Sequence, residues 1–196
     1  MTDRLVGVLL AAGAGSRMGR PKALVRDDAG GEPWVSAGVR MLRGAGCGEV
    51  LVVLGAAADE AATLVPAGTA VVVADDWASG LAASFRTGLS AAADTTADAA
   101  LISLVDLPGL PAAAGARVVA AAGPDLMRAI ARAEYDGRPG HPVLIGRAQW
   151  AEAAEAVRGD AGAGAWLTAV GALRVECGDL ADGRDRDAPE GGRRPR

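Results

Sequence analysis

Glycines and positive charges are concentrated in the segment Leu10–Lys22, which reads LAAGAGSRMGRPK. Gly13 and Gly15 let the backbone approach a ligand closely, so that successive N–H groups can surround phosphate oxygens. Arg17 and Lys22 then supply positive charge, and Lys22 is the only lysine among the 20 lysines and arginines of the chain. A compact ammonium on a flexible stem suits a point contact with a phosphate. The segment therefore predicts a phosphate-binding loop.

The spacing of this loop differs from the two commonest phosphate motifs. A Walker loop requires GxxxxGK[ST], but two residues separate Gly19 from Lys22, and Ala23 follows in place of a hydroxyl residue. A dinucleotide fingerprint requires GxGxxG, whereas the third glycine here comes four residues after the second. Kinase-like and NAD-binding functions are therefore disfavoured. Chance is the alternative explanation of the lysine, and it would place a single lysine in this loop about one time in sixteen.

A carboxylate follows another apolar run in the segment LISLVDLP, where Asp106 precedes Leu107 and Pro108. A carboxylate at the end of a buried strand can hold Mg²⁺ against nucleotide phosphates. An aspartate near a proline is equally typical of a turn or a helix N-cap. The motif alone leaves both roles open. Together with the glycine loop at the same sheet edge, it favours the metal role.

The elements that must position these residues are read from hydrophobic patterns in the first half of the chain. Continuous Val, Leu and Ile runs predict strands buried on both faces, at Arg4–Leu10, Glu49–Leu54, Thr69–Val73 and Ala100–Val105. Apolar residues at helical spacing predict helices over Pro33–Gly44 and Ser79–Ala93. Ser79 is the expected N-cap of the second helix, whose N-terminus is also a natural anion site.

The same alternation continues to the end of the chain. The expected elements are a helix over Pro111–Ala122, a strand over Met127–Ala133, a turn over Asp136–Gly140, a strand over His141–Ile145, helices over Ala148–Val157 and Ala163–Val170, and a strand over Leu173–Cys177. Strands alternating with helices predict one α/β domain with a three-layer, mostly parallel sheet. We assign residues 1–190 to this domain and expect residues 191–196, which are charged and rich in Gly and Pro, to be disordered.

Composition narrows the classes of partner and the compartment. The net charge of −4 and the pI of about 5.0 argue against a nucleic-acid-binding protein. Cys47 and Cys177 lack CxxC spacing and nearby histidines, so neither a zinc site nor a disulfide framework is indicated, and we expect a reduced, cytoplasmic setting. The apolar segment near the N-terminus is too short to span a membrane, and Asp3 beside Arg4 leaves no positive leader region.

The segment L-A-A-G-x-x-x-R-M-G-x-x-K resembles the signature of nucleotidyltransferases of the molybdenum cofactor type, the MobA-like NTP transferase family. This resemblance implies a Rossmann-like fold of the nucleotide-diphospho-sugar transferase type. LAAG is similar to the cytidylyltransferase branch, whereas the guanylyltransferase branch more often has LAGG. The resemblance spans nearly the whole chain through WASGLAASFRTGL (Trp77–Leu89), LVDLP (Leu104–Pro108), GRPGHPVLIGR (Gly137–Arg147), GDAGA (Gly159–Ala163) and DRDAPE (Asp185–Glu190).

The resemblance implies a Mg²⁺-dependent enzyme in which the terminal phosphate of molybdopterin attacks the α-phosphate of CTP and pyrophosphate leaves. Catalysis by such a site is positioning plus electrostatic stabilisation. Arg17, Lys22 and Asp106 match the catalytic positions. The matched nucleotide-binding positions are Leu10, Ala11, Ala12, Gly13, Gly15, Ser16, Ser79, Gly80 and Ser84.

The acceptor and metal positions also follow from the resemblance. DRDAPE is similar to a family segment D-x-D-T-P-E-D, which makes Asp187 the second metal ligand beside Asp106, with Asp185 as the alternate and a solvated acidic tail as the competing interpretation. His141, the only histidine, and Asp160 match the acceptor side. A lone histidine is often a satisfied polar residue, but here the resemblance implies a contact to the pterin or its phosphate. No general base is needed, because the attacking phosphate is already anionic at pH 7.

Departures from the family pattern leave the acceptor open. Where the family usually has Thr, this chain has Ala188, and where the family has an acid, it has Gly191. Ala74 and Asp75 replace the family's Asn-Pro, and Gly164 replaces an Arg. Relatives transfer nucleotides to phospholactate, phosphoenolpyruvate or sugar phosphates, and these are the nearest alternatives. A different class is a non-catalytic nucleotide or cofactor carrier that serves a molybdenum hydroxylase, the partner protein that the resemblance suggests.

Overall fold

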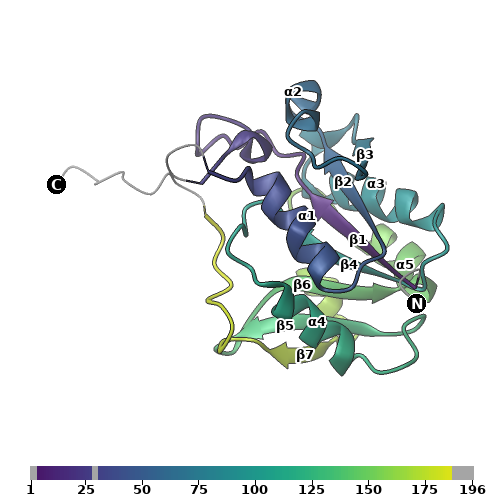
Figure 1. Cartoon of the computed structure of the whole chain (residues 1–196). Helices are drawn as coiled ribbons and strands as arrows, with labels where there is room; N and C mark the ends of the chain where they lie inside the picture. Colours follow the sequence, from purple (N-terminus) through teal and green to yellow (C-terminus); the bar gives the residue numbers. More distant parts are fainter. Residues whose placement is uncertain (1–3, 28–30, 187–196) are drawn as a thin grey trace.

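The computed structural model describes residues 4–27 and 31–186. Its strands are β1 (Leu5–Leu10), β2 (Glu49–Leu54), β3 (Ala70–Val73), β4 (Ala99–Leu104), β5 (Ile130–Tyr135), β6 (Arg138–Gly146) and β7 (Leu173–Glu176). They form one sheet in the order β3-β2-β1-β4-β6-β5-β7, which runs from top to bottom in Figure 1. All six residues of β1 are buried, as expected for a continuous apolar strand in the middle of a parallel sheet.

The sheet is mostly parallel, as predicted, with one exception. β1 pairs in parallel with β2 and β4, β2 with β3, and β5 with β7. β6 runs antiparallel to both β4 and β5. The connection from β5 to β6 is therefore a hairpin rather than a helical crossover, and β6 begins at the edge where β4 ends.

The hairpin differs from the predicted boundaries. The strand expected over Met127–Ala133 begins at Ile130 and extends to Tyr135, and the turn expected over Asp136–Gly140 contracts to two residues. Asp136 and Gly137 both have positive φ angles, of 52° and 79°. Two such residues match the twist of the flanking strands in a tight hairpin.

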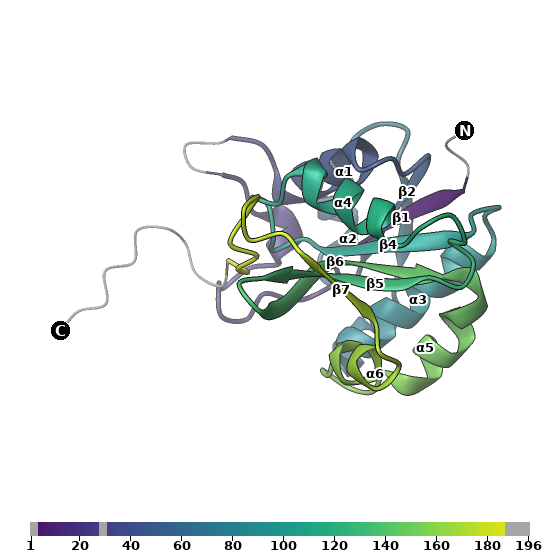
Figure 2. The same ribbon diagram turned by 90° about the horizontal axis from the view of Figure 1, so that it is seen from below.

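Helices cover both faces of the sheet and give the predicted three layers (Figure 2). The helices are α1 (Trp34–Gly44), α2 (Ala58–Ala62), α3 (Leu81–Ala93), α4 (Ala112–Ala121), α5 (Trp150–Ala156) and α6 (Gly164–Ala169). α1 and α4 lie on one face, and α3, α5 and α6 lie on the other. The short helix α2 was not expected from the sequence. In residues 4–27 and 31–186, no helix is both long and apolar enough to cross a membrane.

One sheet edge collects the segments that carry the predicted chemistry. Leu10 at the end of β1 is in register with Leu104 at the end of β4. The loop after β1 and the segment containing Asp106 therefore leave the sheet side by side. The last described residues return to the same place, where the Arg186 N–H donates to the Asp106 carbonyl oxygen at 2.9 Å.

Candidate active site

The loop after β1 is anchored at its start by backbone hydrogen bonds to the neighbouring strand. The Ala11 N–H donates to the Val53 carbonyl at 2.9 Å, and the Ala12 carbonyl accepts from the Ala56 N–H at 2.9 Å. Gly15 then turns the chain with a φ of 61°. A Cβ at Gly15 would lie 2.0 Å from the Arg20 carbonyl oxygen, so only glycine fits this turn.

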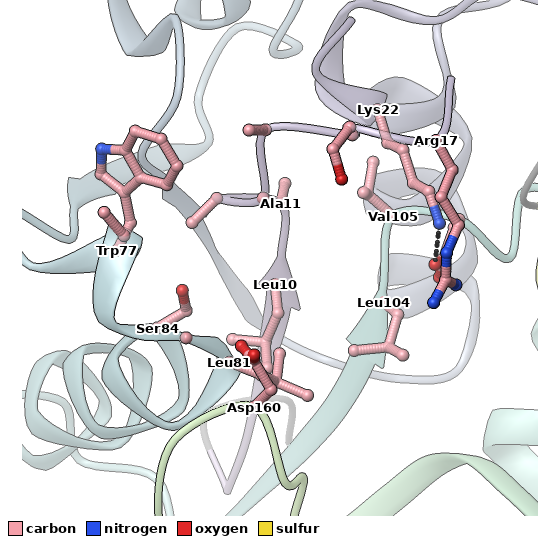
Figure 3. Close-up of a pocket in the computed structure, with 18 residues that line it drawn as sticks. Leu10, Ala11, Arg17, Lys22, Trp77, Leu81, Ser84, Leu104, Val105 and Asp160 are labelled. Atoms are coloured by element: carbon pink, nitrogen blue, oxygen red, sulfur yellow. Dashed lines mark hydrogen bonds and ion pairs between the residues drawn. The ribbon is translucent and has the colours of Figure 1, made fainter. Parts of the chain in front are cut away.

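Lys22 and Asp106 form an ion pair across the two segments, with 2.7 Å between Lys22 Nζ and Asp106 Oδ2. The two side chains keep only 17% and 16% of their surfaces exposed. Lys22 opens a short 3₁₀ turn, Lys22–Leu24, which fixes its position after Pro21. Figure 3 shows the ion pair as a dashed line, with Arg17 beside Lys22. The loop cation and the strand-end carboxylate predicted from sequence are thus in direct contact.

The second carboxylate oxygen of Asp106, Oδ1, gives the site its metal-binding potential. Asp106 Oδ1 is buried and has no hydrogen-bond partner within the described part of the chain. Leaving a carboxylate oxygen buried and unpaired costs free energy unless a cation or donor binds it. Mg²⁺ and Mn²⁺ accept one or two protein carboxylates together with substrate phosphates and water. Asp106 therefore fits a divalent metal that shares its coordination with a nucleotide.

Further metal ligands are sparse in the described residues. No group of three or more His, Cys, Asp or Glu side chains suited to a metal occurs in residues 4–27 and 31–186. Asp185 is exposed. Asp187, the predicted second ligand, lies outside the described residues. The chain that leads to it does reach the site, because Arg186 is hydrogen-bonded to Asp106 through its backbone.

The start of α3 packs against the GDAGA segment and forms the other side of the site. The Ala82 N–H donates to the Gly159 carbonyl at 2.9 Å. Gly80 has a φ of 113°, and a Cβ there would lie 2.6 Å from both Asp160 Oδ1 and the Gly159 carbonyl oxygen. This close approach places Asp160 at the cleft, which the buried Ser84 also lines.

A cleft of about 530 Å³ lies between these two sides. Figure 3 shows Arg17 and Lys22 on one side and Trp77 on the other. The predicted site residues that line it are Leu10, Ala11, Ala12, Gly13, Gly15, Ser16, Arg17, Lys22, Gly80, Ser84, Asp106 and Asp160. Sequence reasoning missed Trp77 and Leu81, although both lie in the WASGL segment.

Ser79 does not lie where the sequence predicted. It is exposed and does not line the cleft. The prediction that it caps the helix is wrong, because α3 begins at Leu81 and Gly80 occupies the N-cap position without a side-chain hydrogen bond. The extended, positive-φ backbone at Gly80 sets the start of the helix instead.

His141 lies in a smaller adjoining cavity rather than in the main cleft. Burial, and next the charge of Arg132, lower the pKa of His141 to about 4. The imidazole is therefore neutral at pH 7. Its backbone is held by the Tyr135 hydroxyl, which donates to the His141 carbonyl at 2.6 Å.

Known proteins are similar to this chain in sequence and in fold. The model of the MobA-like NTP transferase domain matches residues 7–175. A relative from Paenarthrobacter nicotinovorans, named nicotine blue oxidoreductase, is 37% identical over 196 aligned residues, with 95% of this chain and 93% of the relative covered.

Two solved mycobacterial structures are similar over most of the chain. One is a homologue of Mycobacterium tuberculosis Rv0371c from Mycobacterium sp. strain JC1, with 31% identity, a TM-score of 0.78, and coverage of 96% of this chain and 92% of that one. The other is Rv0371c from M. tuberculosis in complex with manganese, with 25% identity, a TM-score of 0.70, and coverage of 89% and 87%. A divalent metal thus binds a protein of this type.

The fold type is shown by a more distant structure, 4-diphosphocytidyl-2C-methyl-D-erythritol synthase. It has 16% identity and a TM-score of 0.67, with 97% of this chain and 95% of that chain covered. The likeness confirms the nucleotide-diphospho-sugar transferase fold predicted from the sequence. Because the family model spans most of the chain, the chain belongs to the MobA-like NTP transferase family and is a nucleotidyltransferase of that family, acting on a nucleoside triphosphate.

Proposed function

We propose that this protein transfers CMP from CTP to the molybdopterin cofactor and releases pyrophosphate. The observation that carries the proposal is the Lys22–Asp106 pair at the mouth of the glycine-loop cleft, with one Asp106 oxygen left unpartnered. A cation for phosphate and a carboxylate for a divalent metal are the two groups that nucleotidyl transfer requires. In this structure the two neutralise each other. Binding of a metal–triphosphate complex would exchange their mutual contact for contacts with substrate.

The residues of the cleft account for the steps of the transfer. Backbone N–H groups of the loop from Ala11 to Gly15 bind the base and phosphates, and Arg17 and Lys22 stabilise the charge that develops on the triphosphate. An oxygen of the acceptor phosphate forms a new bond to the α-phosphorus, and the bond from that phosphorus to the β-phosphate oxygen breaks. Pyrophosphate leaves with the electron pair of that bond. Positioning and electrostatic stabilisation supply the rate enhancement.

Asp106 would hold the divalent metal through its unpartnered oxygen, with Asp187 as the proposed second ligand. A bound Mg²⁺ would neutralise phosphate charge and orient the triphosphate. The manganese complex of the 25% identical mycobacterial protein supports a divalent ion in this fold. Mg²⁺ is the proposed physiological ion because of its preference for phosphate oxygens.

Product analysis tests the proposal. The protein is incubated with Mg²⁺, CTP and molybdopterin, and the products are identified by mass spectrometry. The expected product is the cytosine dinucleotide form of the cofactor. A product from GTP alone would move the protein to the guanylyltransferase branch. Parallel reactions with phospholactate, phosphoenolpyruvate and sugar phosphates identify the acceptor if molybdopterin yields nothing, an outcome that would fit the departures at Ala74 and Gly164.

A second candidate function follows from the relative named nicotine blue oxidoreductase. With 37% identity over nearly the whole chain, that relative supports an oxidation or reduction of nicotine blue or a similar compound. The absence of the GxGxxG fingerprint counts against a nicotinamide dinucleotide in this loop. The test is oxidation of NADH or NADPH that depends on nicotine blue. Such turnover without pyrophosphate release from any nucleoside triphosphate would select the redox function.

A further inference from the structure

A second, smaller cavity adjoins the nucleotide cleft. Its volume is about 100 Å³, and it shares Leu10, Leu81 and Leu104 with the main cleft. The remaining wall is apolar apart from two side chains, Arg132 and His141. A volume equal to about three water molecules accommodates one phosphate or carboxylate group.

The register of the sheet places Arg132 in this cavity. Arg132 on β5 pairs with Val143 on β6, and Val143 pairs with Ile102 on β4. Paired residues point to the same side of a sheet, and both Ile102 and Val143 belong to the core under α3, α5 and α6. The Arg132 side chain therefore lies on that inner face, between Val143 of β6 and Arg174 of β7.

One donor of the Arg132 guanidinium is left without a hydrogen-bond partner within the described part of the chain. Its Nε is buried and makes no hydrogen bond there. Burial, and next the charge of Arg174, lower the pKa of Arg132. Glu134, two residues along the same strand, opposes this lowering through its charge, but its ion pair is with Arg174. A half-buried cation with a buried, unpartnered donor costs free energy unless an acceptor binds it.

His141 completes the polar part of the cavity. Because β6 runs antiparallel to β4, its first half lies at the edge where β4 leads to Asp106. The neutral imidazole adds no like charge beside Arg132, and one of its ring nitrogens can donate a hydrogen bond. The cavity therefore presents donors and a single positive charge next to the nucleotide.

We propose that Arg132, together with His141, binds an anionic group of the acceptor, a phosphate or a carboxylate, in this cavity. That the anion belongs to the acceptor depends on the proposed nucleotidyl transfer, whereas anion binding in this cavity does not depend on it. An arginine fork binds such oxygens in a bidentate manner. Arg132 is then a specificity-determining residue that selects acceptors by an anionic group placed beside the nucleotide.

The test uses His141 as a reporter, since it is the only histidine in the chain and its imidazole NMR signals are unambiguous. The full chain is titrated with sodium phosphate, and separately with sodium acetate, at constant ionic strength and without nucleotide. Arg132→Gln is compared with Arg128→Gln, which removes an exposed arginine just before β5. Arg132→Lys, which keeps the charge but loses the fork, replaces the glutamine variant if that variant fails to fold.

We expect a saturable shift of the His141 signals that weakens at least about tenfold in Arg132→Gln, several-fold in Arg132→Lys, and not in Arg128→Gln. The anion that binds more tightly identifies the group as phosphate or carboxylate. No saturable shift with either anion, or equal binding by Arg132→Gln, overturns the proposal. A shift that is lost in Lys22→Ala but kept in Arg132→Gln also overturns it, because the anion would then occupy the main cleft. None of these readouts needs turnover, so failure of the transfer reaction remains a separate result.

Discussion

Replacing Asp106 by asparagine separates the two roles that the structure gives this carboxylate. Asparagine keeps the shape and one acceptor oxygen for Lys22, but it removes the negative charge that would hold a divalent metal. We expect pyrophosphate release to fall about 100-fold or more, which corresponds to roughly 3 kcal/mol of lost transition-state stabilisation. The fold should remain intact.

The cost in stability can be bounded from the exposure of the pair. Fully exposed ion pairs contribute up to about 1 kcal/mol, whereas removing one partner of a buried pair costs about 3–5 kcal/mol. With exposures of 17% and 16%, the Lys22–Asp106 pair lies between these limits. Because asparagine still accepts a hydrogen bond, we expect Asp106→Asn to cost about 1–2 kcal/mol, a fall in Tm of roughly 2–8 °C for a chain of this size.

A double-mutant cycle isolates the interaction itself. Urea unfolding of Lys22→Met, Asp106→Asn and the double variant should give a coupling free energy of about 1 kcal/mol, because the two single changes remove the same contact. Asp98→Asn is the matched control, since Asp98 pairs with the exposed Arg4 just before β4 and should cost less than about 1 kcal/mol. Additive effects would refute the ion pair. Normal turnover in Asp106→Asn would refute the metal role.

Three further changes test other parts of the site. Lys22→Ala should raise KM for CTP and lower kcat, with kcat/KM reduced roughly 10- to 100-fold in a pyrophosphate-release assay. Unchanged kinetics would leave chance as the explanation of a lysine at this position. Gly80→Ala should lower stability by about 1–3 kcal/mol in calorimetry, because alanine is strained at a φ of 113° and its Cβ would meet Asp160; an unchanged Tm contradicts this packing. The pKa of His141 is about 4 in the folded chain, against an ordinary value of 6.5. Between pH 6.5 and pH 4 the unfolded chain therefore binds a proton at His141 that the folded chain does not, so the free energy of unfolding falls as the pH drops through this range. The loss should be about 3 kcal/mol. It is measured as the difference in urea unfolding between wild type and His141→Asn at both pH values, and equal pH dependence of the two proteins would contradict the shift.

Strands buried on both faces were the most predictable elements. β1, β2 and β4 lie within one residue of the predicted boundaries, because uninterrupted Val, Leu and Ile runs have few alternatives to a central strand. Their parallel pairing follows from the intervening helices. The meeting of Lys22 and Asp106 at one edge was predictable for the same reason, since both follow strands that end at that edge.

The antiparallel β6 was not predicted, although its signal is present. Asp136 and Gly137 form a D-G pair between two strand-like segments, which is a strong hairpin indication. Because the turn was expected to span the five residues Asp136–Gly140, the D-G pair was not recognised as a two-residue hairpin turn. The consequence for function is that the direction of β6 brings His141 to the ligand edge, which the strand pattern alone could not show.

Arg132, Trp77 and Ser79 illustrate residues whose roles depend on tertiary structure. In IARAEY, Arg132 looks like a solvent-facing residue of a half-buried strand, and only the register with Val143 shows that its side of the sheet is covered by helices. Trp77 faces the cleft because it precedes the turn at Gly80. Ser79 has the composition of an N-cap, but the backbone at Gly80 starts the helix later.

Pyrophosphate release with Mg²⁺ and molybdopterin, compared among CTP, GTP and ATP, tests the central claim most directly. The Asp106→Asn variant is the blank, because it keeps the cleft and lacks the metal-binding charge. We expect release that depends on CTP and on Mg²⁺ in the wild type and is close to background in the variant. Absence of release with all three nucleotides, or equal release by the variant, would contradict transfer at the Lys22–Asp106 site.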